Sequence, residues 1–230
     1  MARTTIDLNA DLGEEVTDDD ALLAVVSSAN VACGYHAGSP AIMRAVCAEA
    51  ARRGVSVGAQ VSYDDRPGVG RVPRDVAYGV LRDQVADQVG TLERIAEAAG
   101  TSVRYVKPHG ALYHRVIDDE EQARAVLDGS GDLPVLGMPG RLLTLAAGAG
   151  RAVLHEGFPD RGYTPDGRLV PRSETGALVT EEHQIVAQAL VLAATVDSLC
   201  LHGDSPGAVA HALAVRRALV DAGLLLRPFA

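Results

Sequence analysis

Residues 30–40 read Asn-Val-Ala-Cys-Gly-Tyr-His-Ala-Gly-Ser-Pro, and they pass from an apolar strand candidate to the start of a helix. Gly34 and Gly38 flank His36, and glycine permits backbone conformations that other residues avoid. A histidine in this setting is typical of a side chain presented by a tight turn at a strand end. The alternative is a histidine that only satisfies the turn. The same kind of polar strand end recurs along the chain, which favours a functional role for His36.

The composition predicts a compact chain without a membrane segment or a nucleic-acid surface. Its 230 residues are 47% hydrophobic but only 3% aromatic, which predicts one domain over residues 1–230 with a core of Ala, Val and Leu. The formal net charge of −9 argues against nucleic acid as a partner. No apolar run approaches a membrane span and residues 1–12 lack a signal-peptide pattern, so we expect a cytoplasmic protein. The cysteines lack paired spacing, which argues against a disulfide framework or a structural zinc site.

Strand and helix candidates alternate along the chain, and this pattern requires a parallel sheet covered by helices. The predicted strands are residues 4–8, 29–33, 55–59, 103–106, 133–137, 152–155 and 198–201. The predicted helices are residues 18–26, 40–53, 75–99, 120–127, 141–147, 181–194 and 206–222. Ser39 before Pro40 predicts one helix start, and Gly54 predicts the end of the same helix.

Two long loops, residues 60–73 and 156–176, interrupt the alternation. Loops of this length in a compact domain are usually lids or binding loops. Pro165-Asp-Gly167 is a turn signal, which predicts a small hairpin in the second loop. Both loops carry arginines. The candidates are Arg66, Arg71, Arg74, Arg161 and Arg172, and we expect one or two of them to bind a substrate carboxylate, whereas the commoner role of a single loop arginine is a bracing ion pair.

Polar residues follow most of the predicted strands. They are Asn9, Asp11, His36, Gln60, Lys107, His109, His155, Glu156, His202 and Asp204. In a closed barrel the carboxyl ends of all strands meet at one mouth, whereas an open doubly wound sheet gathers only those at its switch point. Because six strand ends carry such residues, the pattern favours the barrel.

Some of these residues provide the material for a general acid/base site or a divalent metal site. They are Asp11, His36, His109, His202 and Asp204. A carboxylate with two histidines would hold zinc or a similar ion and activate water for attack on a carbonyl carbon. The sequence has no compact ligand motif, so the metal ligands stay unassigned.

Lys107 is the single lysine among 21 Lys and Arg residues. It follows a strand that should be buried, so we expect it to stabilise a developing oxyanion or to bind an anion. The alternative is a surface lysine. The sequence has no Gly-x-x-x-x-Gly-Lys-Ser/Thr loop and no Gly-x-Gly-x-x-Gly after the first strand, which argues against an autonomous P-loop ATPase or dinucleotide enzyme.

Six blocks of the sequence resemble the LamB/YcsF family, in family order. They are residues 6–14 (Ile-Asp-Leu-Asn-Ala-Asp-Leu-Gly-Glu), 28–38 (Ser-Ala-Asn-Val-Ala-Cys-Gly-Tyr-His-Ala-Gly), 106–113 (Val-Lys-Pro-His-Gly-Ala-Leu-Tyr), 160–163 (Asp-Arg-Gly-Tyr), 166–172 (Asp-Gly-Arg-Leu-Val-Pro-Arg) and 200–204 (Cys-Leu-His-Gly-Asp). Together they make the resemblance specific. It implies a distorted TIM-like β/α barrel of seven strands, similar to the glycoside hydrolase and deacetylase superfamily.

The resemblance also implies a function. The family supplies the A subunit of bacterial 5-oxoprolinase, so it implies hydrolytic, ATP-dependent opening of the 5-oxoproline lactam to glutamate together with B and C subunits. ATP is then expected at a composite site or on a partner subunit. The expected catalytic residues are Asp11, His36, Lys107 and His109. The residues expected to bind or orient the substrate are Asn9, Asn30, Arg71, His202 and Asp204.

One position departs from the family pattern. The family commonly reads Gly-Ala-His-Pro-Ser after the third strand, whereas this chain reads Gly-Ala-Gln-Val-Ser at residues 58–62. Gln60 is a poor substitute for a histidine ligand, so the use of a divalent metal stays open. Two alternatives stand beside the leading hypothesis. One is a stand-alone metal-dependent amide or acetyl hydrolase of the deacetylase type, and the other is a non-catalytic subunit that binds 5-oxoproline.

Overall fold

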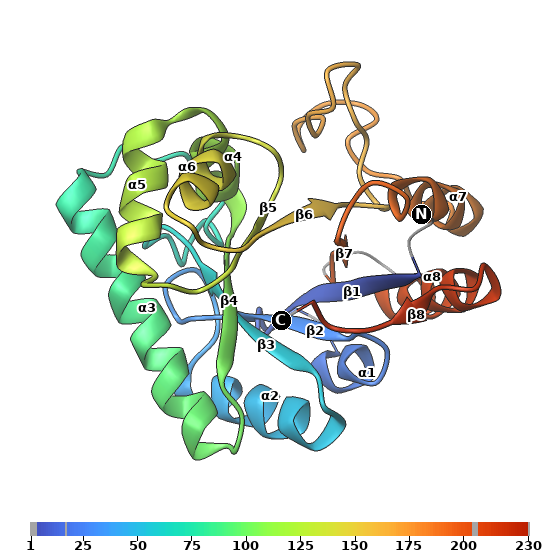
Figure 1. The fold of residues 1–230 in the computed structure, drawn as a ribbon, viewed down its shortest axis with the longest axis horizontal. Helices are drawn as coiled ribbons and strands as arrows, with labels where there is room; N and C mark the ends of the chain where they lie inside the picture. Colours follow the sequence, from blue (N-terminus) through green and yellow to red (C-terminus); the bar gives the residue numbers. More distant parts are fainter. Residues whose placement is uncertain (1–3, 17, 204–206, 230) are drawn as a thin grey trace.

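Within the residues that the computed structural model describes, 4–16, 18–203 and 207–229, seven parallel strands form a closed barrel (Figure 1). Neighbouring strands pair in the order β2-β3-β4-β5-β6-β7-β1, and β1 also pairs with β2, which closes the ring. The strands are β1 (Thr5–Leu12), β2 (Ser28–Ala32), β3 (Ser56–Val61), β4 (Val103–Pro108), β5 (Val135–Gly137), β6 (Val153–Gly157) and β7 (Ser198–Leu201). The predicted seven-stranded β/α barrel is confirmed.

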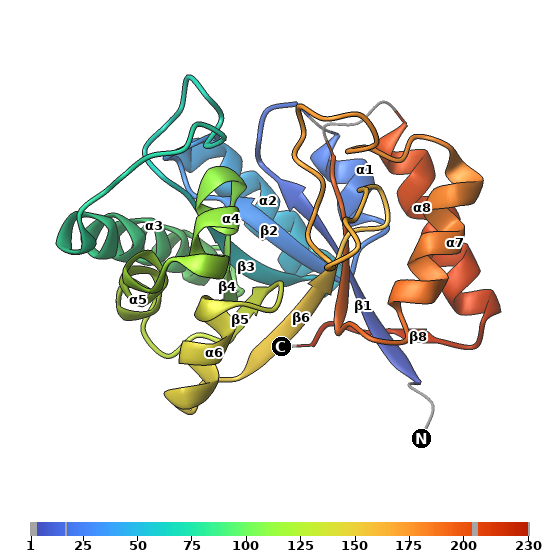
Figure 2. The same cartoon turned by 90° about the horizontal axis from the view of Figure 1, so that it is seen from above.

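Helices connect the strands and cover the outside of the barrel (Figures 1 and 2). They are α1 (Asp19–Leu23), α2 (Pro40–Arg53), α3 (Tyr78–Ala98), α4 (Gly110–Asp118), α5 (Glu120–Gly129), α6 (Arg141–Gly148), α7 (Glu182–Leu192) and α8 (Ala208–Asp221). The boundaries of α2 follow from the sequence. The Ser39 side chain accepts a hydrogen bond from the backbone of Ile42, and Gly54 ends the helix in the left-handed conformation. The predicted start and end of α2 are confirmed.

The strands separate an apolar core from a polar barrel interior. Successive side chains of a strand point to opposite faces of the sheet. Leu8 and Ala10 of β1 therefore pack in the main hydrophobic core, whereas Asp7, Asn9 and Asp11 bond to side chains of other strands. All five side chains are buried. The barrel interior is thus a hydrogen-bonded polar network that leads up to the carboxyl ends of the strands.

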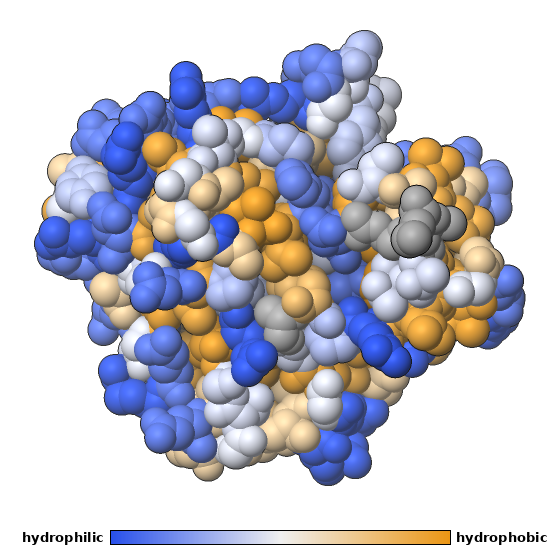
Figure 3. All heavy atoms as spheres, viewed as in Figure 1, coloured by the Kyte–Doolittle hydropathy of each residue, from blue (hydrophilic) through white to orange (hydrophobic). Residues whose placement is uncertain are grey.

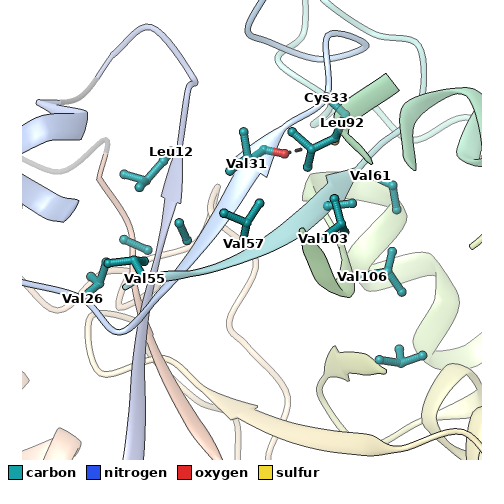
Figure 4. Packing of buried hydrophobic residues seen from close by; sticks show 14 of the residues in the cluster. Leu12, Val26, Val31, Cys33, Val55, Val57, Val61, Leu92, Val103 and Val106 are labelled. Carbon is teal, nitrogen blue, oxygen red and sulfur yellow. Dashed lines mark hydrogen bonds between the residues drawn. The ribbon is translucent and has the colours of Figure 1, made fainter. Parts of the chain in front are cut away.

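Figure 4 shows part of the apolar core. Leu12, Val31, Val57 and Val106 come from four consecutive strands, and Leu92 comes from α3. Burying one such side chain stabilises a fold by roughly 1.5–3 kcal/mol. The core is built mainly from Val, Ala and Leu, as the low aromatic content predicted.

Several predicted strand ends were wrong, because polar residues near the carboxyl ends belong to the strands. β1 includes Asn9 and Asp11, β3 includes Gln60, β4 includes Lys107, and β6 includes Glu156. These side chains are buried and make hydrogen bonds or ion pairs inside the barrel. Because a buried polar group is tolerated when it has partners, the first polar residue does not end a strand here.

Two elements were not predicted. The first is α4, which begins at Gly110, between the predicted strand at 103–106 and the predicted helix at 120–127. Gly110 has a φ of +58°, and a Cβ atom there would lie 2.3 Å from the carbonyl oxygen of Gly70, so the position requires glycine. The second is β8 (Leu225–Leu226), which pairs with the beginning of β1 outside the ring.

Both long loops contribute to the mouth of the barrel. The carbonyl oxygen of Gly70 in the first loop accepts a hydrogen bond from the backbone of Ala111, which ties this loop to α4. The second loop contains the antiparallel bridge Tyr163–Leu169, which confirms the predicted hairpin. The loops are therefore attached to the strand ends that carry the polar residues.

The exterior carries aliphatic side chains on α7 and α8, and these two helices pack together. The exposed large aliphatic residues of this helix pair are Leu190, Val191, Leu213 and Val220. Figure 3 shows apolar atoms over this helix pair. Among the described residues, no helix is long and apolar enough to cross a membrane.

Candidate active site

A cavity of about 700 Å³ opens at the carboxyl ends of the strands. Asp11 and Lys107 reach it from β1 and β4, and His109 and His202 reach it from the residues that follow β4 and β7. The remaining lining comes mainly from α4 and from the two long loops. The predicted convergence of polar strand ends at one mouth is thus present for these four residues.

Lys107 forms an ion group with two carboxylates on the cavity floor. Its Nζ atom lies 3.0 Å from Asp11 Oδ1, 2.8 Å from Glu156 Oε1 and 3.2 Å from Cys200 Sγ. Burial by itself would lower the pKa of Lys107, but the carboxylates of Asp11 and Glu156 raise that pKa well above its ordinary value. Burial likewise opposes ionisation of Asp11, but Lys107 and His109 hold its pKa well below the usual range. Lys107 is therefore an ammonium and Asp11 a carboxylate at neutral pH.

Asn9 and Asn30 lie beneath this ion group and do not line the cavity. Asn30 Nδ2 donates to Asp11 Oδ1 at 2.9 Å and to Asn9 Oδ1 at 2.6 Å. Asn9 Nδ2 donates to Glu156 Oε1 at 3.1 Å. Both amides are completely buried. They contact the two carboxylates that bind Lys107, those of Asp11 and Glu156.

A second cluster joins Glu14, His36 and His109 beside the floor. Glu14 Oε1 lies 3.3 Å from His109 Nδ1 and 3.8 Å from His36 Nε2. The two imidazole rings stack with centroids 4.1 Å apart. Potential ligand atoms of the three side chains all lie within 4.8 Å of one another, and all three side chains are buried. Two imidazoles and a carboxylate are a common ligand set for a divalent transition metal, so this cluster is able to hold one.

Hydrogen bonds and burial set the environment of the two histidines. His109 Nε2 lies 3.1 Å from the carbonyl oxygen of Val69, which places an N–H on Nε2 and leaves Nδ1 as the ring nitrogen that faces Glu14. Burial and the neighbouring His109 lower the pKa of His36, which favours its neutral form. Neither ring nitrogen of His36 has a hydrogen-bond partner among the described residues. Both imidazoles therefore direct a ring nitrogen into the cluster.

His202 and Asp160 form a dyad on the cavity wall. His202 Nδ1 lies 3.0 Å from Asp160 Oδ2, and the backbone N–H of His202 donates to the same oxygen at 2.9 Å. The ring of His202 also stacks on Phe158 at 5.4 Å. Burial would raise the pKa of Asp160, but the charge and hydrogen bonds of His202 lower it. Because Asp160 binds Nδ1, Nε2 is the nitrogen left for proton transfer.

The cavity lining is strongly basic although the whole chain is acidic. Its acidic members are Asp11 and Asp118. Its permanently basic members are Arg71, Arg74, Lys107, Arg115, Arg161 and Arg172. Such an excess of positive charge in a cleft attracts anionic ligands.

The loop arginines differ in their contacts. Arg161 is buried and donates to the carbonyl oxygens of Ala177 and Val170, so it braces the second loop. Arg74 pairs with Asp65 at 2.7 Å. Arg71, the residue predicted to bind a substrate carboxylate, is exposed and lines the cavity.

Two residues expected at the mouth of the barrel, His155 and Asp204, are not found there among the described residues. His155 was expected at the mouth, but its ring is nearly half exposed and lies 3.5 Å from Asp197, which precedes β7. The expectation was wrong because adjacent residues of a strand point to opposite faces, and Glu156 takes the inward position. Asp204, predicted to bind or orient the substrate, lies outside the described residues.

Three site residues were missed by the sequence reasoning. Glu14 and Asp160 each stand in a block that resembles the LamB/YcsF family, but no role was assigned to them. Glu156 was noticed only as a polar residue after a strand. Their partners are distant in the sequence, so no local spacing reveals the contacts. The only sequence signal for a functional role was that Glu14 and Asp160 stand in blocks resembling the family and that Glu156 follows a predicted strand.

The LamB/YcsF family model matches residues 6–230 of the chain. The chain belongs to the LamB/YcsF family. A relative from Streptomyces coelicolor, named as the A subunit of 5-oxoprolinase, is 55% identical over 249 aligned residues, which cover 98% of this chain and all of that protein. The resemblance drawn from the six sequence blocks is therefore confirmed.

Solved structures support the same fold. The "lactam utilization protein" from Thermus thermophilus is 35% identical, with a TM-score of 0.91 over 98% of this chain and all of that one. A family 4 carbohydrate esterase from Streptomyces lividans is only 12% identical, with a TM-score of 0.53 over the whole of this chain and 95% of the other. The second likeness shows that the barrel has the architecture found in carbohydrate esterases.

Proposed function

We propose that this chain is the lactam-opening component, the A subunit, of an ATP-dependent 5-oxoprolinase. It would hydrolyse the cyclic amide of 5-oxo-L-proline to L-glutamate in a complex with B and C subunits. The observation that carries this proposal is the cavity floor, where the buried Lys107–Asp11–Glu156 ion group lies among histidines under a basic rim. The high identity to proteins named for this subunit supports the same assignment.

The substrate would be oriented by its charge. 5-Oxoproline carries a carboxylate next to the lactam nitrogen, and the basic lining of the cavity suits an anion. Arg71 is exposed on the first loop at the cavity, so it would bind this carboxylate. The lactam carbonyl would then lie deeper, toward Lys107. The ammonium would stabilise negative charge on the lactam oxygen as water adds to the carbonyl carbon.

The cluster of Glu14, His36 and His109 would hold a divalent cation. The buried His36 nitrogens without hydrogen-bond partners and the lowered pKa of His36 fit such an ion. When bound, the cation would polarise the attacking water, so that a weak base suffices to remove the proton. The Asp11 carboxylate is that base in our scheme, because its Oδ2 atom lies 3.8 Å from His109 Nδ1 at the edge of the cluster.

Breaking the carbon–nitrogen bond requires a proton on the departing nitrogen. His202 would supply it from Nε2, because Nδ1 is bound to Asp160. The Asp160 carboxylate would stabilise the protonated ring, as the acidic partner of a catalytic histidine does. Asn9 and Asn30 would act as positioning residues that hold Glu156 and Asp11 around Lys107.

ATP would be handled outside this cavity. The sequence contains no phosphate-binding loop of the common kinds, and an unstrained lactam is hard to hydrolyse without activation. We therefore assign to a composite site or to the partner subunits the transfer of the γ-phosphoryl group of ATP to the lactam oxygen, which would release ADP; this phosphoryl group would leave as inorganic phosphate when hydrolysis of the opened ring is completed to glutamate.

A second candidate function is a stand-alone, metal-dependent amide or acetyl hydrolase. The Glu14–His36–His109 cluster favours it, because a metal-activated water can cleave an amide without ATP. A third possibility, a subunit that only binds 5-oxoproline, would leave the acid/base dyad without a task.

Reconstitution separates these functions. Glutamate release from 5-oxoproline would be measured for the chain alone, for the B and C subunits without it, and for the mixture, each with and without ATP. The proposal predicts release only from the complete mixture with ATP. ATP-independent amide or acetyl hydrolysis by the chain alone would favour the second function. Equal release without this chain would contradict any catalytic role.

A further inference from the structure

Gln60 is an additional member of the Glu14–His36–His109 cluster. It lies near the carboxyl end of β3 and is completely buried. Its Nε2 atom lies 3.0 Å from Glu14 Oε1 and 2.8 Å from His109 Nδ1. The carboxamide therefore contacts two of the three proposed ligands directly.

Several polar atoms of this cluster lack a partner. Gln60 Oε1 and both ring nitrogens of His36 are buried without a hydrogen bond to any described residue. An unpaired buried polar group costs about 1–3 kcal/mol, and three such atoms in one cluster point to a ligand. A divalent cation would satisfy a carbonyl oxygen and an imidazole lone pair together.

The spacing of the atoms also suits an ion. Ligands about 2.1 Å from a metal lie about 3.0 Å from one another in octahedral geometry and about 3.4 Å in tetrahedral geometry. Glu14 Oε1 and His109 Nδ1 are 3.3 Å apart. Gln60 Nε2 lies 3.0 Å from Glu14 Oε1 and 2.8 Å from His109 Nδ1. Half a turn of the carboxamide would place Oε1 at this position.

We propose that Gln60 Oε1, with Glu14, His36 and His109, completes a four-residue site for a first-row divalent cation. When Nε2 of Gln60 faces the cluster, the amide donates hydrogen bonds to Glu14 and His109. When Oε1 faces the cluster instead, the amide oxygen becomes a ligand of the cation. The inference rests on the proposed function for the role of the site, but ion binding can be measured on the isolated chain without lactam, ATP or partners.

The donor set sets the preference for ions. Two imidazole nitrogens suit zinc and cobalt, whereas carboxylate and amide oxygens suit manganese. A site with two nitrogens and two oxygens accepts all three ions. Replacing Gln60 with histidine would give three nitrogens and one oxygen, so it would favour zinc over manganese relative to the natural site.

The test is calorimetric titration of chelator-treated protein with Mn²⁺, Co²⁺ and Zn²⁺ in separate experiments. We expect one ion per chain, affinity at least about tenfold weaker in Gln60→Leu, and tighter binding in Gln60→Glu, which adds a negative charge. Gln60→His should raise the ratio of zinc to manganese affinity. Gln184→Ala, an exposed substitution on α7, should bind as the wild type does.

Thermal unfolding of each variant shows whether it folds, and Gln60→Glu keeps the shape of the side chain if Gln60→Leu does not fold. Wild-type affinity in both Gln60→Leu and Gln60→Glu would overturn the role of Gln60. The absence of binding to the wild-type chain would overturn the site. Neither result would exclude lactam opening, which is measured separately by glutamate release from the reconstituted complex.

Discussion

Replacing Lys107 with methionine tests the ion group in the barrel interior. Lys107 Nζ lies 3.0 Å from Asp11 and 2.8 Å from Glu156, and none of the three side chains is more than 8% exposed. Methionine keeps much of the volume but leaves two carboxylates buried without their counter-charge. Removing one partner of a buried ion pair costs about 3–5 kcal/mol, so we expect the free energy of unfolding to fall by that amount.

The assay is urea denaturation at pH 7 of Lys107→Met, Glu156→Gln and the double variant. Because Glu156→Gln removes one of the two carboxylates, the double variant should be more stable than the sum of the single effects predicts, by about 1–3 kcal/mol. Arg52→Met is the matched surface control. Arg52 pairs with Glu49 but is 66% exposed, so its loss should cost less than about 1 kcal/mol. Equal effects of Lys107→Met and Arg52→Met would refute the reasoning.

Further predictions concern pH, proton transfer and the loop. Burial raises the pKa of Asp7 from 3.8 to about 6 despite hydrogen bonds from three serines, so the folded state binds the proton more tightly than the unfolded state. The unfolding free energy should therefore fall by up to about 3 kcal/mol as pH rises from 4 to 7, and Asp7→Asn should remove this loss in denaturation curves. Asp160→Asn should lower the rate of lactam opening by at least about tenfold and shift its pH profile, since it changes the partner of His202; an unchanged profile would contradict the dyad. Gly110→Ala should lower the thermal midpoint, because its Cβ would collide with the carbonyl oxygen of Gly70; an unchanged midpoint would contradict the close packing.

Local chemistry made much of the fold predictable. Ser39, Pro40 and Gly54 set the limits of α2 through interactions within a few residues. α4 escaped prediction because Gly110 at its start resembles a turn residue, and its conformation is set by the contact with Gly70 in another loop. Polar residues inside strands misled the prediction of strand ends, because their burial depends on partners from the opposite side of the barrel.

Some members of the site were predictable from the sequence, but their pairings were not. Lys107 was expected to be buried and functional, and it is buried in an ion group. Its partner Glu156 lies on another strand, and only the closure of the barrel brings the two together. The candidates for an acid/base or metal site included Asp11 and the histidines without assigning ligands, whereas the structure gathers Glu14 with His36 and His109 and pairs Asp11 with Lys107. These choices depend on ångström-scale geometry that spacing along the sequence does not contain.

The most direct test of the proposed function is glutamate release by the reconstituted complex with Asp11→Asn in this chain. The substitution keeps the size of the side chain but removes the carboxylate that binds Lys107 and takes the proton of water in our scheme. We predict a fall in glutamate release of at least about 100-fold, with 5-oxoproline binding and circular dichroism retained. Glutamate release at the wild-type rate would contradict the assignment of the chemistry to this cavity.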